Sequence, residues 1–253
     1  FRRVLFRSYS RSRIEEHAAY EANLIGALLA RGVPTAAVVP SVKDAPLRVE
    51  GAPTLLYRWL GGELRKKPEY PIGEIAGALA RLHAAQIADP PDLGQDFRFD
   101  DTCMIWLPAF ERYRAMEWED AALRQALDAL APLAQWHHEG SHRGALFASS
   151  PHVHCHGDVT PKNVLIDQTG GARFFDFNNA FYGPRLADVI DGAFEFSLAE
   201  QYIHLADFGR FPAFVDAYAD IAPLTPGERD DLVRWTELIG LIKFTKELRV
   251  VLQ

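Results

Sequence analysis

The sequence predicts an α+β fold in which a small antiparallel sheet is followed by a larger, mainly helical part. Short β-prone runs, separated by Pro and Gly, lie between about residues 37 and 57. Apolar residues recur at helical spacing from about residue 71 onward. Two further β-prone runs flank a turn signal at 168–171, which predicts a hairpin inserted among the helices.

The N-terminal part combines one helix with several short strands. A capping-box signature at Ser12–Glu15 predicts where the helix begins, and Gly32 predicts where it ends. The β-prone runs that follow predict the strands of a small antiparallel sheet, around 37–39, 47–49 and 54–57.

Helical patterns dominate the remainder of the chain. The first of them begins near Ile72 and contains His83, which we interpret as a packing residue. Residues 86–101 are rich in Pro, Asp and Gly and are expected to form a loop. We interpret His137–Arg143 as a solvated loop and not as a metal cluster. The later helices are expected at roughly 103–118, 119–140, 188–201, 211–218 and after the capping box at 225–228.

The composition is that of a soluble globular protein. Of the 253 residues, 48% are hydrophobic and 24% are charged. The net charge of −7 and the lack of a basic block give no indication of a nucleic-acid partner. No apolar run reaches membrane-spanning length, so we expect no membrane association. Cys103 and Cys155 form no disulfide framework, which favours a reducing cytoplasm. The oligomeric state stays open.

The predicted hairpin would bring three oxygen-bearing side chains together. Pairing of 164–166 with 173–175 places Asn163 and Asp176 at one edge, because the two ends of an antiparallel hairpin meet. Asp158 lies on the loop that leads into the first of these strands. Hard oxygen donors at this spacing suit Mg²⁺, which takes few protein ligands and shares the rest with phosphate and water.

A zinc site is an alternative for the same stretch. Its histidines alternate, so that on a strand they would share one face, and a cysteine and an aspartate lie nearby. The candidate ligands are His152, His154, His156, Cys155 and Asp158. Zinc would not account for Asn163 or for the Phe-Asp-Phe run at 175–177.

The double motif resembles a known superfamily. His-Gly-Asp at 156–158, Asn163, a strand, a turn and Phe-Asp-Phe at 175–177 are similar to the aminoglycoside phosphotransferase, choline kinase and type II homoserine kinase superfamily. The resemblance implies a protein-kinase-like fold with two lobes, 1–62 and 63–253. It also implies transfer of the γ-phosphoryl of ATP (or GTP), with Mg²⁺, to a hydroxyl of an aminoglycoside, homoserine, choline or a similar small molecule.

The resemblance assigns roles to five residues around the hairpin. Asp158 matches the catalytic aspartate that accepts or orients the proton of the attacking hydroxyl. Asn163 and Asp176 match the two residues that hold Mg²⁺ against the nucleotide phosphates. His156 matches the histidine that supports the loop, and Asp188 matches an aspartate that braces the loop through backbone hydrogen bonds.

The resemblance also implies a nucleotide site in the N-terminal part. Glu21 matches a helix glutamate that pairs with a strand cation, for which Arg7 is the candidate. The alternative for Glu21 is an exposed helix residue. Backbone groups near Tyr57 to Trp59 would hydrogen-bond the adenine edge and Leu60 would lie near its face. The alternative for this segment is an ordinary strand-to-helix junction.

Three further side chains are candidates for ligand contacts. Lys162 could approach a phosphate, or it could be a solvated loop lysine. Asp191 and Glu195 lie four residues apart on one predicted helix face and could bind a cationic acceptor. The alternative for this pair is a solvated helix face.

A non-catalytic, pseudokinase-like module that binds nucleotide is the second function that the sequence permits. The glycine-rich strands that cover ATP in the superfamily do not precede the first strand, and residue 1 is Phe. We therefore expect the chain to be an N-terminally truncated piece. Asp158, Asn163 and Asp176 together argue for catalysis.

Overall fold

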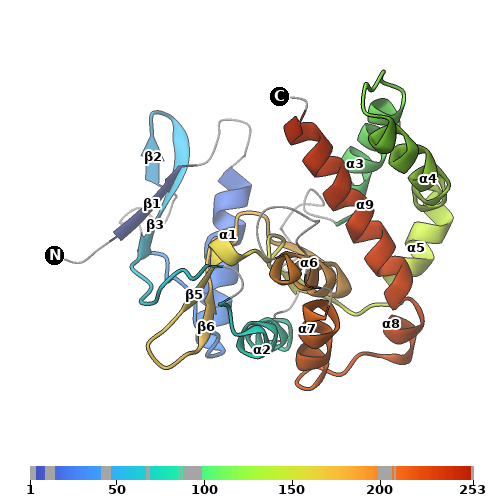
Figure 1. The fold of residues 1–253 in the computed structure, drawn as a ribbon. Helices are drawn as coiled ribbons and strands as arrows, with labels where there is room; N and C mark the ends of the chain where they lie inside the picture. Colours follow the sequence, from blue (N-terminus) through green and yellow to red (C-terminus); the bar gives the residue numbers. More distant parts are fainter. Residues whose placement is uncertain are drawn as a thin grey trace.

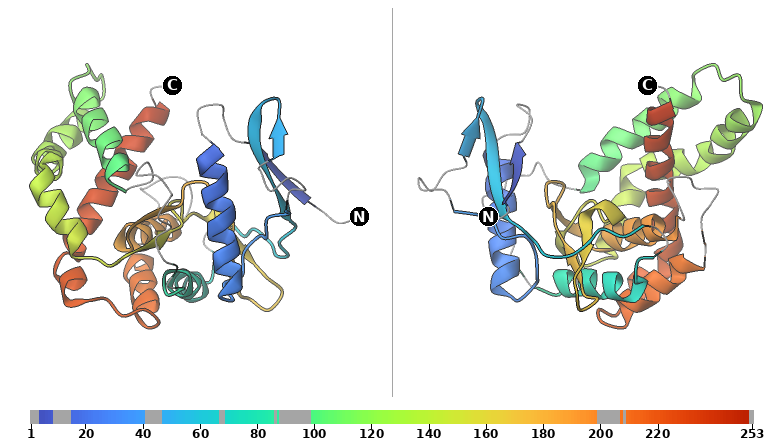
Figure 2. Two further views of the ribbon diagram at one scale, coloured as in Figure 1. Left: turned by 180° about the vertical axis from the view of Figure 1, so that it is seen from behind. Right: turned by 60° about the vertical axis from the view of Figure 1, so that its left-hand side comes forward.

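A three-stranded sheet and a larger helical part lie on opposite sides of one long helix in the computed structural model (Figures 1 and 2). That helix is α1, Glu15–Ala30. The structure describes residues 4–8, 15–40, 47–66, 69–85, 87, 99–198, 207 and 209–251. The predicted order of a sheet followed by helices, and with it the α+β fold class, is confirmed.

The N-terminal sheet is antiparallel, with strand order β1-β3-β2. Its strands are β1 (Val4–Ser8), β2 (Leu47–Val49) and β3 (Ala52–Arg58). The run at 37–39 adds an isolated bridge between Val38 and Tyr57. The inner face of α1 is buried and mostly apolar, as at Leu24 and Leu28. Gly32 has a φ of +77° at the predicted helix end, whereas most of the predicted capping box, residues 12–14, lies outside the described residues.

The segment that follows β3 pairs with the first strand of the predicted hairpin. Glu63 and Ile166 exchange backbone hydrogen bonds of 2.9 and 3.0 Å, so this segment extends the hairpin by one bridge. Gly62 has a φ of +141°, and a Cβ there would lie 2.9 Å from the Cβ of Leu165. Because a larger residue would force the two segments apart, the approach depends on glycine.

The hairpin itself is confirmed, but its second strand begins and ends one residue earlier than expected. Strands β5 (Val164–Ile166) and β6 (Ala172–Phe174) pair antiparallel, with Leu165 opposite Arg173. The Asp167 carboxylate accepts hydrogen bonds from the backbone N–H groups of Thr169 and Gly171 and therefore closes the predicted turn. The Thr169 hydroxyl also donates to this carboxylate, and that hydrogen bond, followed by those from the backbone, lowers the pKa of Asp167 below its usual range.

Strands β4 (His152–Cys155) and β7 (Phe181–Pro184) form a second antiparallel pair, which the sequence did not predict. β4 leads directly into the loop that carries Asp158. Because β7 is followed at once by α6 (Leu186–Ser197), this pair places the start of α6 beside the loop.

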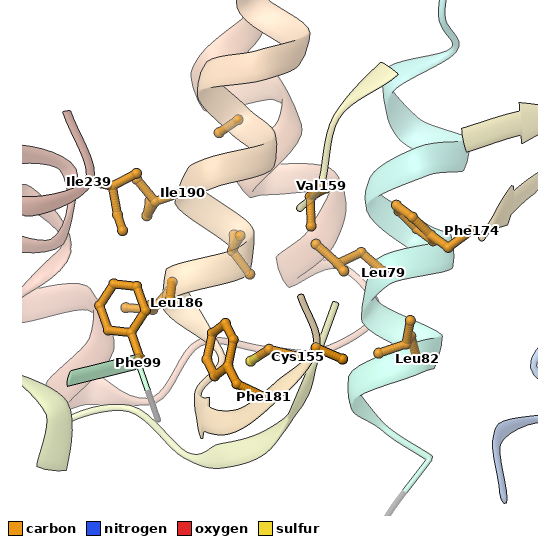
Figure 3. Close-up of a cluster of buried hydrophobic side chains, with 14 of the residues drawn as sticks. Leu79, Leu82, Phe99, Cys155, Val159, Phe174, Phe181, Leu186, Ile190 and Ile239 are labelled. Carbon is orange, nitrogen blue, oxygen red and sulfur yellow. The ribbon is translucent and has the colours of Figure 1, made fainter. Parts of the chain in front are cut away.

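The helical part is built around α6. Helices α6 and α7 (Arg210–Ala219) lie where they were expected, at 188–201 and 211–218, with ends shifted by a few residues. Helix α2 (Ile72–His83) and helix α7 pack together on one side of α6, and α9 (Leu232–Val251) packs on another. Short α8 (Pro226–Asp230) begins with the predicted capping box. In the core, Ile190 meets Ile239, and Val159 lies between α6 and Leu79 (Figure 3).

Two expectations for the remaining helices are wrong. Helix α3 (Phe99–Arg114) begins inside the predicted loop, because Phe99 is buried against Trp235 and Phe147. The stretch 137–143, expected to be a solvated loop, ends α4 (Ala121–His138) and begins α5 (Gly140–Ala148). Tertiary packing overrides the polar composition here. No helix in the described ranges is both long and apolar enough to cross a membrane.

Candidate functional site

The loop between β4 and β5 makes a sharp bend at Gly157. This residue has a φ of +78°, and a Cβ would lie 1.9 Å from the carbonyl oxygen of Asn179. Because that neighbour is backbone, it cannot move aside as a flexible side chain would. Glycine is therefore required both by the left-handed conformation and by the close approach.

Asp188 braces the loop from the first turn of α6. Its buried carboxylate accepts the backbone N–H groups of His156 and of Gly157, the latter at 2.9 Å. His83 Nε2 lies 3.2 Å from the same carboxylate, and His83 Nδ1 lies 2.8 Å from the hydroxyl of Tyr218. The loop thus rests on a buried chain of polar groups from α6, α2 and α7, and His83 is the packing residue that the sequence indicated.

His156 links the loop to the segment that follows β6. Its Nε2 hydrogen-bonds the carbonyl oxygen of Phe175 at 3.0 Å, which requires that nitrogen to carry the proton. Its ring lies against those of Phe174 and Phe177. His156 is fully buried in this position and joins the loop to the segment that follows β6.

Asp158 and Asn163 are in direct contact. The side-chain amide of Asn163 donates to the Asp158 carboxylate at 2.8 Å and to its backbone carbonyl at 3.0 Å. The Asp158 side chain is 25% exposed, whereas that of Lys162, whose ammonium lies 3.7 Å away, is 72% exposed. Asp158 therefore sits at an accessible edge, and Lys162 extends into solvent beside it.

Asp176 follows immediately after the last pair of the hairpin. Phe175 donates its backbone N–H to the carbonyl of Asn163 at 3.1 Å, so Asp176 and Asn163 lie at the same hairpin end. Asp176 has a φ of +69°, in the left-handed region that few residues other than glycine adopt. Such strain persists where the surroundings fix a particular side-chain direction.

The donor set fits a hard divalent cation. Because the Asn163 amide nitrogen is held by Asp158, its carbonyl oxygen is the atom that can face a metal. The carboxylate of Asp176, at the same end of the hairpin, could supply a second hard oxygen. Two oxygen ligands with the remaining positions open are what Mg²⁺ takes when it also binds phosphate.

The N-terminal candidates divide between buried and exposed positions. Glu21 is buried and accepts a 2.7 Å hydrogen bond from the Tyr57 hydroxyl, so the exposed-helix alternative is wrong. Leu60 is buried and Trp59 is 49% exposed. Arg7 lies on β1 opposite Leu55, and its side chain is outside the described part of the chain.

Backbone hydrogen bonds at the end of β3 limit which groups could bind the edge of an adenine. The N–H of Arg58 already donates to the carbonyl of Ala37, and the carbonyl of Leu56 accepts from Val39. This side of the strand is therefore occupied up to residue 58. The segment that begins at Trp59 is the better candidate.

Asp191 and Glu195 are paired with a cation that the sequence did not single out. Lys243 of α9 lies 2.8 Å from the Asp191 carboxylate and 2.6 Å from that of Glu195. The three side chains are only 17–21% exposed, so the pair is not a solvated face. Burial raises the pKa of Asp191, an effect that Lys243 opposes, and the two carboxylates raise the pKa of Lys243 although its burial acts the other way.

The alternating histidines have separate partners. His154 Nδ1 lies 3.0 Å from the hydroxyl of Tyr20, while His156 holds Phe175 as described. Among the described residues, the group whose ligand atoms lie close enough to hold a metal is His83, Cys155 and Asp188. Burial and, less strongly, Asp188 raise the pKa of the Cys155 thiol. The other two members of the group already have partners: His83 contacts the Tyr218 hydroxyl, and Asp188 accepts the backbone N–H of Gly157.

The fold and the loop–hairpin geometry define the class of small-molecule phosphotransferases with a protein-kinase-like fold. The chain matches the model of the phosphotransferase enzyme family over residues 2–226, and it therefore belongs to that family. The superfamily predicted from the double motif is confirmed. No curated protein matches the sequence of the chain.

Solved structures share the fold at low sequence identity. A microcompartment-associated aminopropanol kinase is 17% identical, with a TM-score of 0.70 over 96% of this chain and 77% of that one. The amicoumacin kinase hAmiN, in complex with AMP-PNP, Ca²⁺ and Ami, is 15% identical, with a TM-score of 0.65 over 96% and 72%. An aminoglycoside phosphotransferase from Alicyclobacillus acidocaldarius is 16% identical, with a TM-score of 0.54 over 98% and 87%.

Proposed function

We propose that the chain transfers the γ-phosphoryl of ATP (or GTP) to a hydroxyl group of a small molecule. The observation that carries this proposal is the contact of Asp158 with Asn163, with Asp176 at the same end of the adjoining hairpin. This arrangement occurs in a chain whose family transfers phosphoryl groups. A protein with only a structural role would not need an accessible Asp158 close to Asn163 and Asp176.

Each residue has a distinct task in the proposed reaction. Asp158 orients the acceptor hydroxyl and takes its proton, and the Asn163 amide keeps that carboxylate in place. The Asn163 carbonyl and the Asp176 carboxylate would hold the divalent cation, which when bound neutralises charge on the phosphates. Positioning and charge neutralisation supply most of the rate enhancement in such transfers.

The nucleotide would lie between the N-terminal segment, residues 1–62, and the helical remainder, residues 63–253. Trp59 and Leu60 would contact the base, and Glu21 would act with Arg7 near the phosphates. A related fold binds AMP-PNP with Ca²⁺, which supports use of a nucleotide and a divalent cation. Lys162 would reach a phosphate from its exposed position.

A panel of hydroxylated small molecules, incubated with ATP and Mg²⁺, tests the proposal. We expect the chain to phosphorylate at least one acceptor, and Asp158→Asn to lower the rate by about 10²- to 10⁴-fold, the range for a lost general base. Asp128→Asn makes the same chemical change at a 65% exposed position on α4 and should leave the rate unchanged.

Two results would contradict the proposal. If Asp158→Asn retained most of the activity, Asp158 would not be the base. If the chain bound nucleotide but phosphorylated no acceptor, it would be a non-catalytic binding module. Nucleotide affinity, measured for both variants, separates a lost base from a damaged binding site.

A further inference from the structure

The acid pair on α6 lies next to the loop that carries Asp158. Asp188, one turn before Asp191, holds the backbone of that loop. Gly192 packs so closely that a Cβ there would lie 2.8 Å from Cγ1 of Val159, the residue after Asp158. Figure 3 shows Val159 between α6 and α2. Asp191 and Glu195 lie within one turn of these contacts on the same helix.

The ammonium of Lys243 already serves as the counter-ion of Asp191 and Glu195. This ammonium is within 2.8 Å of both carboxylates and belongs to a side chain that is 17% exposed. It also cannot diffuse away, because α9 carries it. An acceptor ammonium that displaced it would leave Lys243 partly buried without its counter-ions, and this cost opposes the exchange.

We propose that Lys243 is a specificity-determining residue, an internal cation that occupies the place where Asp191 and Glu195 would otherwise bind the ammonium group of an acceptor. The acceptor of this chain is accordingly not held through an ammonium group at this acid pair, and amino alcohols and polycationic sugars that would rely on that contact are disfavoured. The inference rests on the proposed function, because it concerns the acceptor side of the same site. It changes the interpretation of Asp191 and Glu195, which by themselves suggest a cationic acceptor.

Removal of the internal cation tests this inference. The probe is ethanolamine, a small monocation with a hydroxyl group, titrated by calorimetry without nucleotide. We expect wild type to bind it weakly and Lys243→Met to bind it at least about tenfold more tightly, because two carboxylates without a cation attract one. Lys243→Arg keeps the charge and should bind as wild type does.

Lys246→Met is the matched control. It removes one positive charge from the same helix, at a residue whose ammonium lies over the ring of Trp106 and acts on Asp191 less strongly than Lys243 does. It should change ethanolamine affinity much less than Lys243→Met. If repulsion between the carboxylates prevents Lys243→Met from folding, Asp191→Asn with Lys243→Met leaves a single carboxylate, and this variant should bind ethanolamine more tightly than Asp191→Asn alone.

The outcomes separate the inference from the proposed function. Equal ethanolamine affinity in wild type and Lys243→Met, or an equal gain in Lys246→Met, overturns the inference. Phosphorylation of ethanolamine by wild type, with the same KM in Lys243→Met, also overturns it while supporting phosphotransfer. A gain in affinity specific to Lys243→Met shows that Lys243 blocks the acid pair, and it supports the inference together with phosphorylation of an acceptor. If no acceptor is phosphorylated, the proposed function fails although Lys243 still blocks the pair.

Discussion

The loop and hairpin at 155–176 and the helical segment α3–α5 at 99–148 hold their buried polar groups in different ways. In the loop, Asp188 and His156 make hydrogen bonds to backbone groups, and Asn163 holds Asp158. In the helical segment, His137 is fully buried, and neither of its ring nitrogens hydrogen-bonds to any described residue. Its environment is the ring of Trp136 and the charges of Arg143 and Arg234.

The loop and hairpin are therefore held mainly by hydrogen bonds with defined directions, whereas α3–α5 are held mainly by packing. Directional hydrogen bonds hold the loop in one geometry, as the proposed reaction would require. The helical segment instead rests on α9 through apolar side chains such as Phe99 against Trp235. Changes in the loop should therefore affect activity and local geometry, while changes in the helical segment should affect stability and its dependence on pH.

Gly157→Ala should break the loop most severely. The added Cβ would meet the backbone of Asn179 at 1.9 Å and would also strain the left-handed φ. We expect a loss of roughly 4 kcal/mol or more in the free energy of unfolding, in the range of exceptional single mutations. Urea denaturation measures it.

Gly170→Ala separates the effect of the contact with Asn179 from that of the left-handed conformation. Gly170 has a similar φ of +88°, but nothing lies within 4 Å of the added Cβ. This variant should lose only about 1–2 kcal/mol, the cost of the left-handed conformation. Equal losses in the two variants would show that the contact with Asn179 contributes nothing.

Acidification should weaken the helical segment through His137. Burial first, and then the charges of Arg143 and Arg234, lower the pKa of His137 from its ordinary value of 6.5 to about 4. Because the unfolded chain binds the proton more readily, stability is full above pH 6.5 and falls between pH 6.5 and 4. The free energy of unfolding that protonation of His137 removes approaches about 3 kcal/mol.

Thermal unfolding from pH 7 to 4 checks this prediction. His137→Leu should flatten the pH dependence in that window, while His138→Leu, at the exposed neighbouring position, should leave the wild-type slope. An unchanged slope in His137→Leu would mean that other groups dominate the acid response.

Tyr70→Phe should reduce stability less than Gly157→Ala does, and its effect should fall mainly on the loop that carries Asp158. The buried Tyr70 hydroxyl accepts the backbone N–H of Arg65 at 3.0 Å and donates to the carbonyl of Pro161 at 2.6 Å, two residues before Asn163. It therefore ties the segment after β3 to the loop. We expect a loss of about 1–2 kcal/mol in stability and a lower kcat.

Tyr20→Phe is the matched change away from Asn163. It removes a buried hydroxyl that contacts His154 at 3.0 Å. It should reduce stability by a similar amount while kcat stays near that of wild type. Equal loss of kcat in the two variants would contradict a specific role for Tyr70 in the loop.

The sequence predicted what local spacing determines. The hairpin followed from two β-prone runs and a turn, and the proximity of Asn163 to Asp176 followed from antiparallel pairing. The contact between Asp158 and Asn163 follows from their spacing within one loop. The capping box at Thr225 was also predicted, because its two partners are three residues apart.

Contacts between distant parts of the chain were not predictable in the same way. Lys243 meets Glu195 from 48 positions further along the chain, and nothing in its own neighbourhood marks it as the partner. The pairing of β4 with β7 and the burial of His137 likewise depend on packing between elements. The buried link from Asp188 through His83 to Tyr218 joins three helices, of which only the Asp188 role was implied by resemblance.

The most direct test of the account is the metal dependence of nucleotide binding. Calorimetric titration with AMP-PNP, with and without Mg²⁺, should show much tighter binding by wild type when Mg²⁺ is present. Asp176→Asn should lose that difference, and Asp128→Asn should keep it. Metal-independent binding by wild type, or full metal dependence in Asp176→Asn, would contradict the assignment of Asp176 and Asn163 as the residues that hold the cation.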